Sequence, residues 1–374
     1  MISAMAKRVR VAVLLPVYNA MPYLGECVED VLAQVGVEVC LLAVDDASQD
    51  GSKAYLERLV AAQDHVHVDV SDETKAVERW EKEMERKGNM KHGDEPKEVE
   101  RVLERRRKGN RIVVLASEKK GHGHALNAAL VAADADYVGH MEADDLCPPD
   151  RFLKLVQAMQ SDPSLDAACS QIGLVGHITD GMTKYAEWQN GLLTHQQMMK
   201  ARFLEIPALH QSGLYKKHVL EEMRGYQERP DWPVDIDFWN RWFVRGYKVT
   251  KVPEPLYFWR QHQTQSTRTN RKNSLPNLQK CKVHYFCQSE GPAYGKCIQL
   301  WGRGETLKHI GMLMKDAGAQ FVSVDWKPGW PVPEAAIMHQ GSVVRVFLFG
   351  SDKPRDRIRR EFPGFDMEND WFLS

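Results

Sequence analysis

The chain lacks any apolar run near the length of about 18 residues that a membrane-spanning helix requires. Its first residues, MISAMAKR, also lack the apolar core of a secretory signal peptide. The 50 Lys and Arg residues nearly balance the 51 Asp and Glu residues, which leaves a net charge of −1. No global field therefore attracts nucleic acid or a membrane, and any nucleic-acid contact has to come from a local patch.

Paired cysteines are also missing. The seven cysteines are odd in number and form no CxxC motif, so neither a disulfide framework nor a zinc ribbon is favoured. We therefore expect a reducing, cytoplasmic setting without membrane contact. The oligomeric state is left open by these features.

Apolar runs and helical periodicity alternate over the first part of the chain. This alternation is typical of a parallel or mixed sheet with right-handed crossovers, and it predicts an α/β, Rossmann-like fold. The expected strands are residues 8–17, 37–44, 111–117 and 137–141, and the expected helices are residues 22–34, 52–62 and 124–132.

A charged stretch at residues 73–110 interrupts this alternation. It holds twelve Lys or Arg and ten Asp or Glu residues but few apolar ones, so it can bury little surface. We interpret it as a solvated insertion; a docking arm for a large acceptor is the alternative.

The pattern is less regular after residue 150 and predicts a second domain near the end. A helix is expected at 235–245, short strands at 247–252 and 256–259, and a linker at 288–295. A strand at 297–301, a helix that ends at 315 and a strand at 319–325 follow. Another strand is expected at 342–349. The predicted domains are residues 8–287, with the charged insertion, and a small C-terminal Rossmann-like α/β domain at 296–374.

The start of that C-terminal domain partly matches a dinucleotide-binding fingerprint. Gly302-Arg303-Gly304 follows a predicted strand, and Asp325 lies about twenty residues further on. Leu307 replaces the third glycine, so we favour an accessory or acceptor-holding domain over a dinucleotide site.

Two acidic clusters follow predicted strands. They are Asp45-Asp46 and the run Glu142-Ala143-Asp144-Asp145. Carboxylates at the carboxyl ends of strands lie where open α/β sheets bind ligands, and oxygen ligands suit a hard divalent cation. The structural alternative is a turn or a helix N-cap, which Ser48 or Asp50 is expected to provide for the second helix.

Four motifs in register strengthen the ligand-binding interpretation. In this order and spacing they resemble the family 2 glycosyltransferases of the GT-A fold, and the resemblance covers most of residues 8–270. The motifs are PVYN at 16–19, VDDASQDGS at 44–52, GHGHALN at 121–127 and MEADD at 141–145, followed more loosely by DIDFW at 235–239 and RQH at 260–262.

The resemblance implies a UDP-sugar donor and a divalent cation, Mn²⁺ or Mg²⁺, on its diphosphate. Asp144 matches the metal-binding position, His262 matches a position that completes the metal shell or contacts phosphate, and Glu142 stands where the family usually has Asp. The implied nucleotide-sugar-binding residues are Pro16, Tyr18, Asn19, Asp45, Asp46, Gly121, Asn127, Glu142, Ala143 and Asp144.

Asp235 falls where the family places its catalytic base. In an inverting transfer this carboxylate takes a proton from the attacking acceptor hydroxyl. Asp231 and Asp237 are alternatives, and Asp237 can instead pair with Arg241 at i, i+4. Trp232 either stacks on a sugar or base, or packs in the core.

Residues 255–289 contain no Asp or Glu and several cations among aromatic side chains. Such a stretch can bind phosphates and stack bases, or it can serve only the donor diphosphate. The predicted acceptor-binding residues are Trp232, Asp237, Arg268, Arg271 and Lys272.

The short tail narrows the resemblance further. With Trp301-Gly302-Arg303-Gly304 and Val324-Asp325, the chain looks like the cytosolic N-acetylglucosaminyltransferase-like group that includes a queuosine-tRNA galactosyltransferase. This implies transfer of galactose from UDP-galactose to queuosine in tRNA. The alternatives are a transferase that uses UDP-N-acetylglucosamine or another UDP-sugar on a glycan or small molecule, and a non-catalytic module that binds nucleotide sugars.

Overall fold

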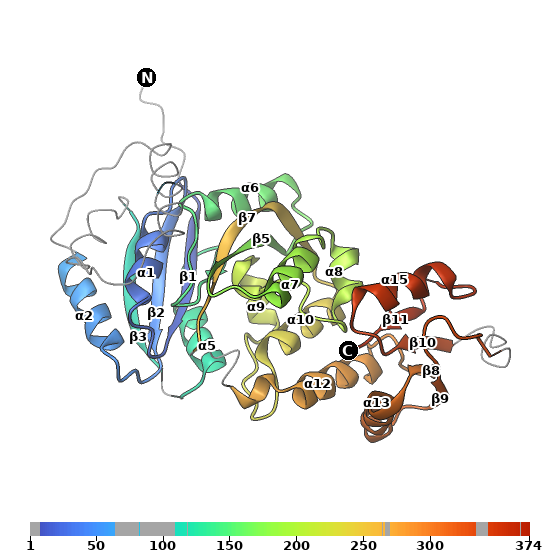
Figure 1. Cartoon of the computed structure of the whole chain (residues 1–374). Helices are drawn as coiled ribbons and strands as arrows, with labels where there is room; N and C mark the ends of the chain where they lie inside the picture. Colours follow the sequence, from blue (N-terminus) through green and yellow to red (C-terminus); the bar gives the residue numbers. More distant parts are fainter. Residues whose placement is uncertain are drawn as a thin grey trace. The chain divides into compact units, whose positions relative to one another are not determined.

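The computed structural model describes residues 8–63, 82, 109–117, 119–263, 265, 270–333, 343–366 and 368–374. Most of the charged insertion and the predicted acceptor residue Arg268 therefore lie outside the described residues. The chain forms two compact units (Figure 1): the first comprises residues 1–195, 208–228 and 247–265, and the second comprises 196–207, 229–246 and 266–374. No helix among the described residues is long and apolar enough to cross a membrane.

A mixed seven-stranded sheet forms the centre of the first unit, in the order β3-β2-β1-β4-β6-β5-β7. Neighbouring strands are parallel except for β6, which runs antiparallel to β4 and β5. The strands are β1 (Arg10–Val17), β2 (Glu38–Asp45), β3 (Arg111–Ala116), β4 (Tyr137–His140), β5 (Ala167–Gly176), β6 (Leu214–Lys216) and β7 (Val249–Gln261).

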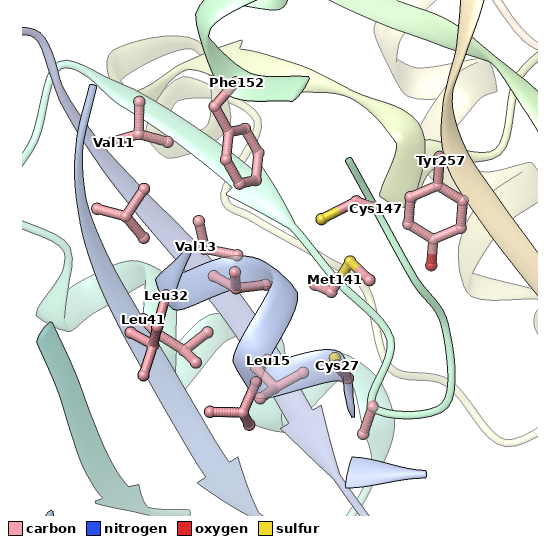
Figure 2. Close-up of a cluster of buried hydrophobic side chains, with 14 of the residues drawn as sticks. Val11, Val13, Leu15, Cys27, Leu32, Leu41, Met141, Cys147, Phe152 and Tyr257 are labelled. Carbon is pink, nitrogen blue, oxygen red and sulfur yellow. The ribbon is translucent and has the colours of Figure 1, made fainter. Parts of the chain in front are cut away.

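Helices cover this sheet and supply its hydrophobic core. Val11, Val13 and Leu15 of β1 pack with Cys27 and Phe152, and Figure 2 shows this cluster. The helices of the unit are α1 (Leu24–Leu32), α2 (Ser52–Gln63), α5 (His122–Ala132), α6 (Arg151–Ser161), α7 (Asp180–Asn190) and α9 (Lys217–Glu222), with a 3₁₀ turn η1 (His210–Ser212); α8 (His195–Ala201) lies almost wholly in the second unit.

β7 corrects the prediction of two short strands. Pro253 and Pro255 suggest a break, because proline donates no hydrogen bond to a sheet. The structure instead has one strand, Val249–Gln261, and its register with β5 shifts around Gln171. This irregularity places Val252 opposite Ser170 and Pro255 opposite Gln171, so the extra residues of the proline segment are accommodated without ending the strand.

The second unit contains a parallel four-stranded sheet in the order β11-β10-β8-β9. Its core joins Ile298, Leu300, Val344 and Val346 to Phe286 of α12. Its elements are α10 (Val234–Val244), η2 (Arg271–Asn273), α12 (Leu275–Cys287), β8 (Cys297–Gly302), α13 (Gly304–Asp316), β9 (Phe321–Asp325), β10 (Val343–Phe347), α15 (Asp352–Glu361) and β11 (Asp370–Phe372).

The predicted strand, helix and strand after residue 296 are present as β8, α13 and β9. Asp325, the acidic residue of the partial fingerprint, pairs with Arg303 (Oδ1 to Nε, 3.0 Å). The second unit also takes in α10 and α12, which precede the predicted linker. The domain boundary at residues 288–295 and the accessory role stay predictions.

Candidate functional site

The loops that follow β1 and β2 are joined by hydrogen bonds. The Asn19 amide N donates to Ser48 Oγ (3.0 Å), and Asn19 Oδ1 accepts from the Gln49 amide (2.7 Å). Asn19 adopts the left-handed φ of 49° that asparagine tolerates better than most residues. Pro16 is buried within β1, whereas Tyr18 is 64% exposed beside Asn19. The two loops therefore form one fixed edge with an exposed aromatic ring.

Asp45 and Asp46 lie at this edge and are both partly exposed. The Asp45 carboxylate accepts weakly from the Ser48 amide (3.3 Å), and Asp46 Oδ2 accepts from the Gly121 amide (2.9 Å). Asp50 accepts from the Ser52 amide (3.1 Å) at the start of α2, the local role expected of Ser48 or Asp50. The structure thus brings the second and third motifs together through Asp46 and Gly121.

The GHGHALN motif forms the beginning of α5. Gly121 has a φ of 126° before the helix, which starts at His122 rather than at the predicted His124. Asn127 Nδ2 donates to the Tyr226 carbonyl (2.7 Å), and Asn127 Oδ1 accepts from the Tyr226 amide (2.8 Å). Asn127 thereby holds the segment before α10 to α5, and its contact with a donor stays a prediction.

Asp144 and His262 meet in the first unit. His262 Nε2 lies 2.8 Å from Asp144 Oδ2, and the two side chains are 16% and 27% exposed. Arg260 Nε donates to the Asp144 carbonyl (2.7 Å), and its Nη2 pairs with Glu26 (2.6 Å). An oxygen and an imidazole nitrogen are thus placed together beside solvent, which suits the predicted metal pair.

Asp145 performs a different task from its neighbour Asp144. It is buried, and its carboxylate accepts hydrogen bonds from the Tyr257 hydroxyl and from the Arg260 amide (2.7 Å). Burial, followed by repulsion from Asp144, raises the pKa of Asp145 well above its ordinary value. Asp145 therefore anchors β7 to the acidic motif, a role that no local sequence pattern signals.

Glu142 faces a group of histidines that sequence reasoning did not find. Its Oε1 lies 3.0 Å from His140 Nε2 and 3.3 Å from His122 Nε2. Burial opposes ionisation of Glu142, but His122, His140 and His210 together lower its pKa to about 2. The neighbouring Ala143 is buried. The carboxylate is thus held by these rings, and its predicted contact with the nucleotide sugar stays a prediction.

Asp235 belongs to the second unit and lies in the first turn of α10. Pro233 is the N-cap, and Asp235 Oδ1 accepts from the Ile236 amide (2.8 Å). The side chain is partly exposed, and its role as the catalytic base stays a prediction. The rival Asp231 is exposed just before this helix.

Asp237 is fully buried in the same unit. It accepts from Trp232 Nε1 (2.7 Å), from the Tyr285 hydroxyl (2.6 Å) and from Arg241 Nε (2.6 Å). The i, i+4 pair with Arg241 is the structural alternative named from the sequence. These contacts argue against the predicted acceptor roles of Asp237 and of Trp232, which is itself buried.

The basic stretch separates into structural and exposed cations. Lys282 is buried and donates to the Leu204 carbonyl (2.7 Å), so it serves the fold of the second unit. Arg271 and Lys280 are exposed, and Lys272 is partly exposed at η2. The exposed part of the predicted basic patch is therefore smaller than the sequence suggested.

Comparison with known proteins assigns the family. A family model described as glycosyl transferase family 2 matches residues 12–78 and 93–224, which are more than half of the chain. The chain belongs to glycosyltransferase family 2. The mixed α/β sheet confirms the fold class predicted from the strand–helix alternation.

The curated relatives are similar over part of their length. An uncharacterized glycosyltransferase from Haemophilus influenzae is 27% identical over 39% of this chain and 52% of its own. One from Methanocaldococcus jannaschii is 26% identical over 51% of this chain and 62% of its own. The amylovoran biosynthesis glycosyltransferase AmsE of Erwinia amylovora is 25% identical over 39% and 53%. The chain thus spans about half to three-fifths of the length of these relatives.

Solved glycosyltransferase structures are more distant. The TarS 1–349 structure from S. aureus, in complex with UDP-GlcNAc, is 14% identical, with a TM-score of 0.47 over 74% of this chain and 66% of that one. The mannosyltransferase PcManGT of Pyrobaculum calidifontis, in complex with GDP-Man and Mn²⁺, is 16% identical, with a TM-score of 0.43 over 75% and 63%.

Proposed function

We propose that this chain is an inverting hexosyltransferase that moves galactose from UDP-galactose to a hydroxyl of queuosine in tRNA. The observation that carries the proposal is the contact of Asp144 Oδ2 with His262 Nε2 at 2.8 Å, within a family 2 glycosyltransferase. Galactose and queuosine come from the resemblance to the N-acetylglucosaminyltransferase-like group.

The residues present fit a divalent cation on a donor diphosphate. Asp144 offers a carboxylate oxygen and His262 an imidazole nitrogen, while both side chains keep some exposure for phosphate oxygens and water to complete the shell. When bound there, Mn²⁺ or Mg²⁺ supplies Lewis-acid stabilisation of the charge on the leaving diphosphate. Asp45 or Asp46, at the fixed edge by Tyr18 and Asn19, is assigned to accept the N3–H of uracil.

Asp235 is assigned as the base. Asp235 lies in the first turn of α10, and its carboxylate accepts the proton of the attacking hydroxyl. One carboxylate suffices because the nucleotide diphosphate leaves without a proton. Asp237 is unsuited to this step because its oxygens already accept three hydrogen bonds.

The acceptor assignment is supported by the exposed cations of the second unit. Arg271, Lys272 and Lys280 stand in a stretch without carboxylates, so phosphates of a polynucleotide meet no competing negative charge from that stretch. Replacing Arg271 and Lys272 together with Gln should reduce the salt dependence of tRNA binding by a slope of about 1–2. An unaltered slope would remove these residues from the acceptor site.

A transfer assay tests the whole proposal. The full chain is incubated with total tRNA, Mn²⁺ and one UDP-sugar at a time, and the digested nucleosides are analysed by mass spectrometry. We expect a hexose added to queuosine with UDP-galactose alone. Release of UDP without any change in tRNA would move the acceptor to a glycan or small molecule, and donor binding without turnover would indicate a non-catalytic module.

A further inference from the structure

Four potential metal ligands converge in the first unit, apart from the Asp144–His262 pair. They are His122, His140, Glu142 and His210, and one ligand atom from each lies within 4.8 Å of all the others. His122 begins α5, His140 ends β4, Glu142 follows it, and His210 begins η1. Three separate segments of the chain therefore supply one compact group of three imidazoles and one carboxylate.

The spacing of these ligands is close to that of a tetrahedral metal site. Bonds of about 2.0–2.1 Å to nitrogen or oxygen place tetrahedral ligands about 3.4 Å apart. Glu142 Oε1 lies 3.0 Å from His140 Nε2 and 3.3 Å from His122 Nε2, which already match that edge. The widest separation is at most 4.8 Å, so a small rotation of the side chains closes the group around an ion.

The protein supplies few hydrogen bonds to the buried His140 ring. Its side chain is fully buried, its Nε2 faces Glu142 Oε1 at 3.0 Å, and neither ring nitrogen makes a well-aligned hydrogen bond within the described part of the chain. Its ring centroid lies 4.8 Å from that of His210 and 5.9 Å from that of His122. Imidazoles gathered so tightly around one carboxylate gain from a cation that all four side chains can bind.

Hydrogen bonds to backbone carbonyls hold the segments that carry the ligands. The buried Arg151 donates to the carbonyl of His140 (3.0 Å) and to that of Gln211 (2.5 Å), next to His210. The Tyr215 hydroxyl donates to the His210 carbonyl (2.6 Å). Outer contacts of this kind hold metal ligands in position and strengthen the site.

We propose that His122, His140, Glu142 and His210 bind a zinc ion. Three nitrogens and one carboxylate oxygen fit the ligand preferences of Zn²⁺, and four protein ligands close its tetrahedral sphere. A closed sphere leaves no position for substrate, so this site is structural. It joins the end of β4 to the beginnings of α5 and η1, and it holds Glu142 while Asp144, two residues later, contacts His262.

The wild-type chain provides the first test, without a histidine tag because a tag binds zinc itself. The full chain is stripped with a chelator, equilibrated with zinc, separated from excess ion by gel filtration and analysed by mass spectrometry of the metal. We expect one zinc per chain. Cobalt in place of zinc should give the intense visible bands of a tetrahedral ion. A wild-type chain that retains no zinc would overturn the proposal.

Variants then locate the ion. His140→Gln should lower zinc affinity at least about tenfold, and so should His122→Gln, which changes a partly exposed ring and preserves the core. His124→Gln, in the same helix but outside the group, is the matched control and should bind like the wild type. Wild-type affinity in both His140→Gln and His122→Gln would refute the site.

Asp144→Asn separates this site from the proposed donor metal. We expect it to retain one zinc and the tetrahedral cobalt spectrum. Loss of zinc in this variant would mean that the ion is held by Asp144 and His262 instead, which would also overturn the proposal.

Discussion

Nε2 of His262 lies 2.8 Å from Oδ2 of Asp144, although 118 residues separate them in the chain. Their strands are not neighbours in the sheet, because β6 and β5 lie between β4 and β7. The approach is made by an antiparallel bridge between Leu146 and Phe258, whose amides and carbonyls exchange hydrogen bonds of 3.1 and 2.9 Å. This bridge places the end of β7 beside the segment that follows the acidic motif.

Asp144→Asn should weaken metal-dependent binding of UDP at least about tenfold, because an amide is a poorer ligand for a hard cation than a carboxylate. Titration calorimetry with UDP and Mn²⁺ measures this. Asp134→Asn is the matched control, since that aspartate is exposed and pairs with Arg10 at 2.8 Å. Equal affinities for wild type and Asp144→Asn would exclude Asp144 from the metal site.

Asp235→Asn should preserve donor binding and lower kcat by about 10²–10⁴, the contribution typical of a general base. The comparison is a single-turnover transfer assay beside a UDP-binding titration. Asp231→Asn serves as the control because this aspartate is exposed in the same segment. If Asp231→Asn instead loses transfer while Asp235→Asn retains it, the base has been assigned to the wrong residue.

Asp237→Asn should destabilise the fold by about 3–5 kcal/mol, because it leaves the buried Arg241 without its charged partner. Urea unfolding followed by tryptophan fluorescence measures the change. Asp356→Asn, which breaks an exposed ion pair with Arg359, should cost less than about 1 kcal/mol. Similar small losses in both variants would contradict the structural role of Asp237.

Because Lys251 is buried, we expect the free energy of unfolding to rise at alkaline pH. Its side chain is 3% exposed, and burial lowers its pKa from 10.5 to about 8. Between these two values the unfolded chain holds a proton that the folded chain has lost, so the free energy of unfolding increases with pH. The gain amounts to about 3 kcal/mol across this window.

Lys251→Met should remove this contribution, whereas Lys248→Met changes an exposed lysine nearby and should retain it. Urea midpoints recorded at intervals from pH 7.5 to about pH 10.5 allow the comparison. Parallel pH profiles for wild type and Lys251→Met would show that this ammonium group does not titrate as its burial implies.

The first half of the sheet was predictable because each of its strands and helices has a clear local sequence pattern. Apolar runs end in Asp45 and His140, and helical spacing begins at Leu24 and Ser52. β7 was not predictable, since Pro253 and Pro255 indicate a break and only the irregular pairing with β5 keeps the strand continuous. Local sequence signals predict single strands and helices well, but they do not predict the strand pairing that keeps a proline-containing strand continuous.

The candidate site shows the same limit. The acidic motifs followed from positions at strand ends, whereas the pairing of Asp144 with His262 was implied by the resemblance to family 2 glycosyltransferases. The histidine group did not, because His122, His140 and His210 have no regular spacing and His210 lies in a region without a predicted element. The cluster exists because β4 ends where α5 and η1 begin.

Three acids within four residues face three different neighbourhoods. Glu142 meets His122 and His140, Asp144 meets His262, and Asp145 is held by Tyr257 and Arg260. An alanine scan of this run should therefore lose activity for three unrelated reasons: an altered histidine group, a missing donor-metal ligand and a detached strand. Metal content, donor affinity and unfolding free energy, measured on each variant, assign one reason to each acid.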